Sequence, residues 1–144
     1  MNNCEVVMTV EEMEKNRDGW LKARMSGIGG SEIAAVLNMS NYGDQFSLWE
    51  RKTGRKTDEI PDNDKMKWGR RLEPIVADGF AEDYGKKLRK CGLMCRKDKP
   101  WMLCSVDRLV VGAEEGVEIK TATSYQRDEW PEDGAPMQYY FQCL

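Results

Sequence analysis

The sequence predicts an α/β (α+β) domain in which a mixed β-sheet is flanked by helices. Two observations lead to this prediction. Apolar residues recur at helical spacing along much of the chain up to Tyr84, and runs rich in apolar and β-branched residues follow from about residue 87. The chain has 144 residues, of which 40% are apolar and 33% are charged, and these values are typical of one globular domain with its own core.

Two helices are expected near the N-terminus. Thr9, followed three residues later by Glu12, resembles a capping box and indicates the start of a helix over residues 9–22. A glycine-rich turn follows at residues 27–31. The run after this turn has helical periodicity, and Ser31 is expected to be its N-cap.

Two more helices are expected farther along the chain. The first of them covers residues 45–53. Residues 54–65 are polar and charged, which predicts a mobile loop. The second covers residues 66–84, where apolar side chains recur every three or four positions. Pro74 lies inside this pattern and either starts the helix proper or kinks it.

Strands are expected near residues 87–95, 101–111 and 115–123. The segment 112–116, which begins and ends with glycine, predicts a tight hairpin between the last two strands. Residues 135–144 begin a further helix. The expected order is therefore helices, a loop, a helix, three strands and the start of a helix.

The composition excludes several kinds of chemistry. The sequence contains no histidine, so Ser-His-Asp and Cys-His nucleophile pairs and any histidine general base are excluded. Its five cysteines form no CxxC pair, and neither a zinc site nor an iron–sulfur cluster is expected. Cys91 and Cys95 are expected to be buried thiols. Hydrolytic chemistry must therefore depend on carboxylates, lysine and a metal ion.

Charge and hydropathy indicate the setting. No apolar run is long enough to span a membrane, and the N-terminus lacks the features of a signal peptide, so a cytoplasmic protein is expected. The net charge of −3 argues against a simple electrostatic binder of nucleic acid. The basic runs at residues 51–56 and 86–90 are typical of a solvated surface.

One group of residues has a recognisable chemical pattern. Ten residues separate Asp107 from Glu118, so a tight hairpin between their strands would place two carboxylates side by side. Carboxylates held this close resist joint ionisation unless a cation lies between them, and Mg²⁺ prefers such hard oxygen ligands. Lys120 would project from the same strand face as Glu118 and meet the scissile phosphate. An exposed strand face that carries a Glu118–Lys120 ion pair is an open alternative.

Four blocks of the sequence, in order, resemble a known nuclease family. The blocks are Trp20…Ala23-Arg24…Gly27-Ile28-Gly29-Gly30-Ser31-Glu32, Trp68-Gly69…Glu73, Ser105…Asp107 with Glu118-Ile119-Lys120, and Pro136…Tyr139…Gln142. Together they resemble the lambda exonuclease-like (YqaJ-like) viral recombinase family within the PD-(D/E)XK nuclease superfamily. The resemblance implies a restriction-endonuclease-like core with a central mixed sheet flanked by helices.

The resemblance also implies an organisation for the whole chain. A single nuclease-like domain over residues 1–144 would comprise helices at 1–53, a mobile loop at about 54–65 and a catalytic core at 66–144. Members of the family continue beyond the last helix of this sequence, so the C-terminal part of the fold is expected to be missing.

A metal site is implied by the same resemblance. The implied ligands of Mg²⁺, or of Mn²⁺ in its place, are the carboxylates of Asp107, Glu118 and Glu73 and the backbone carbonyl of Ile119. Lys120 would position the attacking water.

Further residues are implied in contacts with DNA. Arg24 and Ser31 would bind a terminal 5′-phosphate through a guanidinium group and backbone N–H groups at a helix N-terminus. Ser105 would add a hydroxyl to a neighbouring phosphate, and Gln142 would reach the catalytic region from the last helix. Simpler roles remain open: Arg24 and Glu73 as surface charges, and Ser31 as a helix cap alone.

The implied function is that of a Mg²⁺-dependent deoxyribonuclease of phage or prophage origin, acting in a bacterial host. It would be a 5′-to-3′ exonuclease on double-stranded DNA that serves phage-type recombination and hydrolyses phosphodiesters with metal-activated water. The implied partners are double-stranded DNA ends, a single-strand annealing protein and, with the full family fold, two further copies in a homotrimer. Two alternatives stay open: a non-catalytic protein or fragment that binds DNA ends or a recombination partner, and an endonuclease of the same superfamily.

Overall fold

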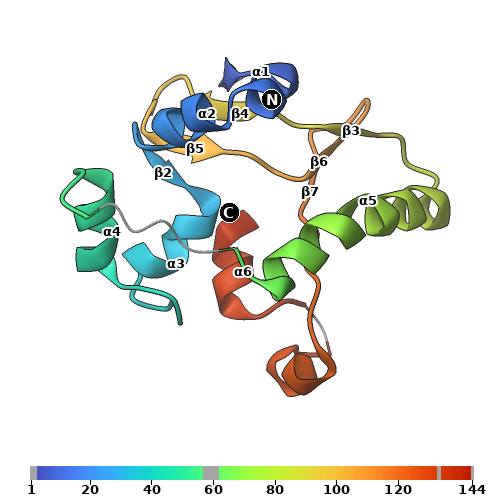
Figure 1. Ribbon diagram of the computed structural model, residues 1–144. Helices are drawn as coiled ribbons and strands as arrows, with labels where there is room; N and C mark the ends of the chain where they lie inside the picture. The colour runs from blue at the N-terminus through green and yellow to red at the C-terminus, as the bar shows by residue number, and fades with distance from the viewer. Residues whose placement is uncertain (1–2, 57–61, 133, 144) are drawn as a thin grey trace. The chain divides into compact units, whose positions relative to one another are not determined.

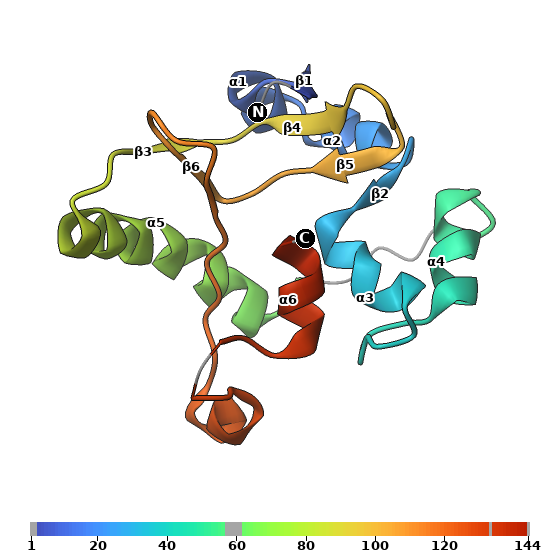
Figure 2. The same ribbon diagram turned by 180° about the vertical axis from the view of Figure 1, so that it is seen from behind.

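The computed structural model describes residues 3–56, 62–132 and 134–143 (Figure 1, Figure 2). Its backbone contacts divide the chain into two compact units. Unit 1 comprises Met1–Asp58, Gly92–Ser105 and Asp128–Leu144, and unit 2 comprises Glu59–Cys91 and Val106–Arg127. Of the mobile loop expected at 54–65, residues 57–61 lie outside the described residues. Residues 64 and 65 are helical rather than part of a loop, because Asn63 caps a helix that begins at Asp64.

Unit 1 contains a four-stranded mixed sheet in the order β1-β4-β5-β2. The strands are β1 (Cys4–Met8), β2 (Ile28–Gly29), β4 (Leu93–Arg96) and β5 (Met102–Cys104). β2 pairs in parallel with β5, and the other neighbouring strands are antiparallel. The sequence patterns predict neither β1 nor β2, because β1 is largely exposed and β2 is only two residues long within a glycine-rich turn.

Unit 1 also contains several short helices. They are α1 (Val10–Lys15), α2 (Arg17–Arg24), the 3₁₀ segment η1 (Gly30–Glu32), α3 (Ile33–Val36), α4 (Gln45–Lys52) and α6 (Met137–Cys143). Thr9 forms the expected capping box, since its Oγ1 accepts a hydrogen bond from Glu12 N at 3.3 Å and Glu12 Oε2 accepts one from Thr9 N at 2.8 Å. The helix expected over 9–22 is two helices, because Asn16 ends α1 and caps α2 through a 2.8 Å bond from Gly19 N.

The core of unit 1 lies between its sheet and the helices α1 and α2 (Figure 1). Leu93, Cys95 and Leu103 are 2%, 5% and 6% exposed. Partly buried apolar side chains from β1, α1 and α2 pack against them: Met8, Met13, Trp20 and Ala23. Burial raises the pKa of the Cys95 thiol, as expected for a cysteine inside an apolar core.

Gly27 allows β2 to approach β5. The N–H group of Ile28, the next residue, donates a 2.7 Å hydrogen bond to the backbone oxygen of Trp101. A Cβ at Gly27 would lie 2.2 Å from that same oxygen, so any other residue would push the two segments apart.

Unit 2 contains a three-stranded antiparallel sheet, β3-β6-β7, and a long helix. Its elements are β3 (Leu88–Lys90), β6 (Arg108–Val110), β7 (Gly116–Val117) and α5 (Asp64–Tyr84). Asn63 caps α5 by accepting a 3.0 Å hydrogen bond from Met66 N, and Gly85 ends it with a left-handed φ of 61°. Pro74 lies inside α5 rather than at its start. The hairpin expected at 112–116 is confirmed by the pairing of β6 with β7.

α5 has 21 residues and would be long enough to cross a bilayer, but charged side chains recur along it. No helix in the described part of the chain is both long and apolar enough to span a membrane.

Two of the expected strands are interrupted. The strand expected near 87–95 is two strands, β3 and β4, which belong to different sheets. They are separated at Cys91 and Gly92, and a Cβ at Gly92 would lie 2.3 Å from the backbone oxygen of Met8. The strand expected near 101–111 is likewise divided into β5 and β6. The short segments Cys91-Gly92 and Ser105-Val106-Asp107 do not by themselves distinguish one strand from two strands with a short break.

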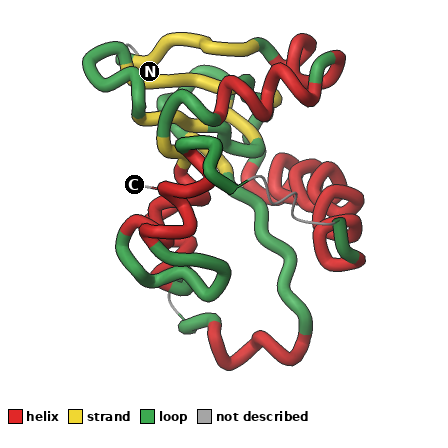
Figure 3. The backbone as a smooth tube through the Cα atoms, turned by 60° about the vertical axis from the view of Figure 1, so that its left-hand side comes forward, coloured by secondary structure: helices red, strands yellow, loops and turns green. Residues whose placement is uncertain are grey.

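The third expected strand, near 115–123, ends early. β7 stops at Val117, and residues 118–123 run as a loop to the 3₁₀ segment η2 (Ser124–Glu129) (Figure 3). The N–H group of Ile119 donates to the carboxylate of Asp107 at 2.7 Å instead of to a neighbouring strand. Glu118 and Lys120 therefore lie just beyond the strand that the sequence predicts to carry them.

We expect Leu93→Ala to lower the free energy of unfolding by about 2–5 kcal/mol, because it leaves a cavity in the core of unit 1. Denaturant unfolding monitored by circular dichroism measures this change. Leu37→Ala is the control, since Leu37 is 45% exposed and its truncation should cost far less. Equal losses in the two variants would contradict the assigned core.

Candidate functional site

A group of charged residues gathers at the β6–β7 hairpin of unit 2. Asp107 directly precedes β6, and Glu118 directly follows β7. Because β6 and β7 are antiparallel neighbours, the start of β6 and the end of β7 lie side by side. Asp107 Oδ2 accepts the 2.7 Å hydrogen bond from Ile119 N, which fixes the segment that carries Glu118. This is the neighbourhood that the spacing of the two carboxylates predicts.

Lys120 pairs with Glu118. The Nζ–Oε1 distance is 2.5 Å, and the side chains of Lys120 and Glu118 are 28% and 13% exposed. The two side chains therefore meet as the sequence predicts, although the residues lie beyond the end of β7.

Glu73, on α5, belongs to the same unit and pairs with a residue that the sequence analysis does not identify. Its Oε1 lies 2.6 Å from Nη1 of Arg108, and Arg108 is only 9% exposed. The same nitrogen donates a 2.7 Å hydrogen bond to the backbone oxygen of Asp107. A guanidinium in an otherwise apolar strand, Arg108-Leu109-Val110, is the signal in the sequence that could have revealed it.

The pKa of Asp107 is raised above its ordinary value, chiefly because the carboxyl group is partly buried. The nearby negative charges of Glu118 and Glu73 raise the pKa further, whereas the Ile119 hydrogen bond and the charge of Lys120 lower it. Asp107 is thus close enough to Glu118 and to Glu73 for their charges to repel its own. A cation placed among them would relieve this repulsion.

The donor chemistry of these residues suits Mg²⁺. Carboxylate and carbonyl oxygens are the ligands that this ion takes in proteins, and Asp107, Glu118, Glu73 and the carbonyl of Ile119 are all of this kind. Within the described residues, no three acidic or cysteine side chains already converge as ligands. Two of the carboxylates are engaged instead by Lys120 and Arg108.

A second group of predicted residues lies in unit 1. Arg24, at the end of α2, donates from Nη2 to Ser31 Oγ at 3.3 Å, and its guanidinium lies 5.0 Å from the ring centroid of Trp20. Ser31 is not the N-cap that the sequence predicts, because η1 begins after Gly29 and Ser31 lies inside it. Its side chain faces Arg24, the other residue predicted to bind a 5′-phosphate.

A nearly buried ion pair fixes the turn beside Arg24. Lys52 Nζ lies 2.8 Å from Glu32 Oε2, with side chains 13% and 11% exposed, and Nζ also donates to the backbone oxygen of Arg24 at 2.6 Å. Glu32 Oε2 in turn accepts a 2.8 Å hydrogen bond from Gly29 N. From the sequence, Lys52 is expected to belong to a solvated basic run, because the neighbours of a lysine in the chain do not reveal a partner that is distant in sequence.

Gln142 lies with the residues of unit 1. α6 packs against η1 and α3 (Figure 2), and a Cβ at Gly30 would lie 2.6 Å from the backbone oxygen of Gln142. Gln142 thus neighbours the turn that carries Ser31. Ser105 is exposed, immediately after β5.

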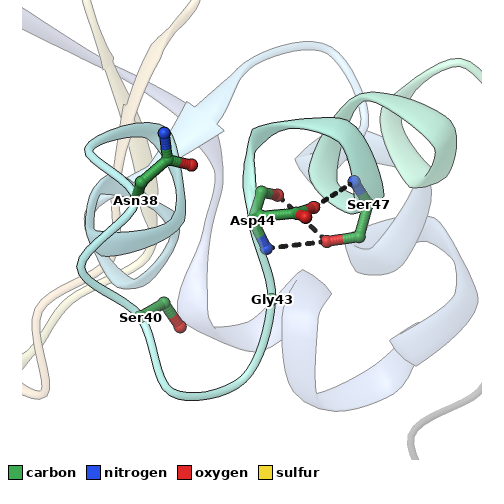
Figure 4. Close-up of a pocket in the computed structure, with 5 residues that line it drawn as sticks. All are labelled: Asn38, Ser40, Gly43, Asp44 and Ser47. Carbon is green, nitrogen blue, oxygen red and sulfur yellow. Dashed lines mark hydrogen bonds between the residues drawn. The ribbon is translucent and has the colours of Figure 1, made fainter.

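A shallow hollow of about 420 Å³ lies at the start of α4 (Figure 4). It is lined by Asn38, Ser40, Gly43, Asp44 and Ser47. Asp44 Oδ1 accepts from Ser47 N at 2.8 Å, and Ser47 Oγ accepts from Asp44 N at 2.9 Å. These are helix-capping bonds, and the hydrogen bonds that the backbone and side chain of Ser47 give to the Asp44 carboxylate lower its pKa.

Comparison with known proteins identifies a family. Residues 19–144 match the model of the YqaJ-like viral recombinase domain. The uncharacterized protein YqaJ of Bacillus subtilis (strain 168) is 32% identical over 143 residues, which are 99% of this chain and 45% of YqaJ. The family resemblance predicted from the four sequence blocks is confirmed.

Solved structures show a similar fold. The crystal structure of LHK-Exo in complex with dAMP has a TM-score of 0.68 and 24% identity, and the match covers 87% of this chain and 64% of that one. The alkaline exonuclease LHK-Exo from Laribacter hongkongensis, in a second structure, has a TM-score of 0.65 and 25% identity with the same coverage. The present chain therefore has an α/β fold like that of this exonuclease, and spans less than two thirds of LHK-Exo and about half of YqaJ.

We expect Lys52→Met to lower the free energy of unfolding by about 2–3 kcal/mol, because it leaves the carboxylate of Glu32 nearly buried and without its cation. Lys22→Met, at an exposed position of α2, should change it little. The double variant Lys52→Met/Glu32→Gln should recover part of the loss, since glutamine still accepts from Gly29 N. A double variant less stable than Lys52→Met would contradict this network.

Proposed function

The chain belongs to the YqaJ-like viral recombinase domain family, and from this membership we propose that it is a Mg²⁺-dependent deoxyribonuclease that degrades double-stranded DNA from its 5′ ends. One observation carries the proposal. The β6–β7 hairpin brings Asp107 together with Glu118 and Lys120, and Asp107 holds the intervening Ile119 through its N–H group. Metal-assisted phosphodiester hydrolysis requires side chains of this kind, namely a pair of carboxylates beside a lysine.

The residues of unit 2 would have two roles, metal binding and orientation of the attacking water. Asp107, Glu118 and Glu73, with the carbonyl of Ile119, would hold Mg²⁺ or Mn²⁺. When bound, the ion supplies a Lewis acid for the phosphodiester and lowers the pKa of the attacking water. Lys120, released from Glu118, would orient that water and offset the negative charge that builds on the phosphate oxygens.

The residues of unit 1 support action from a 5′ end. Arg24 and Ser31 face each other at 3.3 Å, and a guanidinium beside a hydroxyl suits a terminal phosphate. Gln142 lies against the same turn, so we propose that it serves this phosphate region. Ser105 would contact a neighbouring phosphate. That LHK-Exo has been crystallised with dAMP, a nucleotide, supports a nucleic-acid substrate.

A second candidate is a protein that keeps this fold and binds DNA ends or a recombination partner without cutting. One observation favours it: Lys120 and Arg108 already pair with two of the carboxylates that a metal ion would need. An annealing-protein partner, a homotrimer and an endonuclease activity stay predictions of the resemblance.

We expect Lys120→Ala to bind Mg²⁺ within a few-fold of the parent but to lose at least about 10²-fold in cleavage, because the lysine acts on the reacting groups rather than on the metal. Asp107→Ala/Glu118→Ala should lose both. Calorimetry with Mg²⁺ and release of nucleotides from linear duplex DNA measure the two properties, and Lys67→Ala on α5 is the control. Metal binding by the parent without cleavage would favour the non-catalytic candidate, and no binding by the parent would contradict the proposed metal site.

We expect Arg24→Ala to slow cleavage of 5′-phosphorylated duplexes by about 10- to 100-fold, because a charged hydrogen bond to the phosphate is lost. Duplexes with a 5′-hydroxyl should be affected much less. Arg17→Ala is the matched control, since Arg17 also lies on α2 and over the ring of Trp20 but is not beside Ser31. An equal effect of Arg24→Ala on both kinds of end would refute the assignment, and cleavage of closed circular DNA would indicate an endonuclease.

A further inference from the structure

We infer that Arg108 is a positioning residue, which holds Glu73 in place for the metal site through an ion pair beside Asp107, between a nearly buried guanidinium and a partly exposed carboxylate. The inference rests on the proposed function, since it assigns Arg108 a task within the Mg²⁺ site. It adds a residue that belongs to none of the sequence blocks discussed above.

The burial of Arg108 strongly favours an ion pair. It lies on β6, the central strand of the sheet, opposite Lys90 of β3 and Val117 of β7. It is 9% exposed, and the two residues that follow, Leu109 and Val110, are 2% and 8% exposed. A guanidinium removed from water in this way is strongly unfavourable unless a carboxylate and hydrogen-bond acceptors receive it.

The contacts of Arg108 join the two segments that carry the carboxylates. Its Nη1 lies 2.6 Å from Glu73 Oε1 on α5 and 2.7 Å from the backbone oxygen of Asp107. A single nitrogen therefore fixes the distance between the Glu73 carboxylate and the residue at the centre of the site. Only Oε1 of Glu73 has a hydrogen bond among the described residues, which leaves Oε2 to serve as a ligand.

The surroundings of Arg108 also direct it towards Glu73. Its other side lines a hollow of about 520 Å³ between α5 and β3. The charged residues around this hollow are mostly cations: Lys86, Lys87, Arg89 and Lys90, with Asp78 as the acidic member. Lys86 is itself paired with Glu115, and the exposed Lys87, Arg89 and Lys90 add only a solvent-screened repulsion that favours the guanidinium staying with Glu73.

The sign of one effect distinguishes this role from simple electrostatics. If Arg108 were only a nearby positive charge, its removal would strengthen the binding of a cation. If it positions Glu73, its removal weakens the binding, because the carboxylate loses the partner that orients it. Loss of such a supporting partner typically lowers metal affinity by about 10- to 100-fold.

The test is Mg²⁺ and Mn²⁺ titration by calorimetry on the full chain and on Arg108→Met, Arg108→Lys, Glu73→Gln and Glu73→Gln/Arg108→Met. We expect Arg108→Met to weaken binding by about 10- to 100-fold, and Arg108→Lys to restore part of the affinity. In the Glu73→Gln background, Arg108→Met should cause no further loss, because Arg108 acts through Glu73. Arg89→Met removes the same charge from the neighbouring strand, where Arg89 is exposed and opposite Leu109, and should leave the affinity unchanged or slightly higher.

Circular dichroism and thermal unfolding establish that each variant is folded. If Arg108→Met fails to fold, Arg108→Lys and the double variant, in which both members of the pair are neutral, carry the comparison. Affinity in Arg108→Met equal to that of Arg89→Met, or a further loss of affinity from Glu73→Gln to Glu73→Gln/Arg108→Met, would overturn the inference and leave the proposed nuclease function intact. Absence of metal binding by the parent chain would overturn both.

Discussion

The hydrogen bond from Ile119 N to the carboxylate of Asp107 is the contact on which the candidate site depends. β7 ends at Val117, so the next residues have no neighbouring strand to hold them. The 2.7 Å bond to Asp107 replaces that strand and fixes the segment that presents Glu118 and Lys120. It also requires Asp107 to keep an acceptor oxygen, although partial burial and two nearby carboxylates raise its pKa.

Two of the three carboxylates around this bond have cationic partners. Glu118 is neutralised by Lys120 at 2.5 Å and Glu73 by Arg108 at 2.6 Å, which leaves Asp107 as the carboxylate with the raised pKa. The two cations differ in kind. The Lys120 side chain is 28% exposed and flexible enough to turn towards a substrate, whereas the nearly buried Arg108 is held between β6 and α5. In the proposed function one cation acts on the substrate and the other supports the site.

In unit 1, close backbone contacts and an ion pair fix the turn before η1. Glycines bring backbones together at the turn before η1, and the Glu32–Lys52 pair ties this turn to the end of α2. Arg24 and Ser31 are thereby held facing each other. In the proposed function this pair binds a terminal phosphate, and an arginine that is already held in place loses less side-chain entropy on binding than a flexible one.

The sequence by itself determined the α/β class, the capping box at Thr9, the long helix that ends at Gly85 and the β6–β7 hairpin, because each depends on residues close together in the chain. The ten residues between Asp107 and Glu118 likewise predicted that a hairpin would bring the two residues to the same end of adjacent strands. Only the tertiary structure decided that the strands near 87–95 and 101–111 are divided between two sheets, that Ser31 lies inside η1, and that Arg108 and Lys52 find their partners. Apart from the position of Ser31, these outcomes depend on residues far apart in the chain: Glu73 and Arg108, for example, are 35 positions apart. Local propensity and periodicity carry no information about such pairs. The ion pairs form because a buried charge without a partner is unfavourable, and burial occurs only in the folded chain.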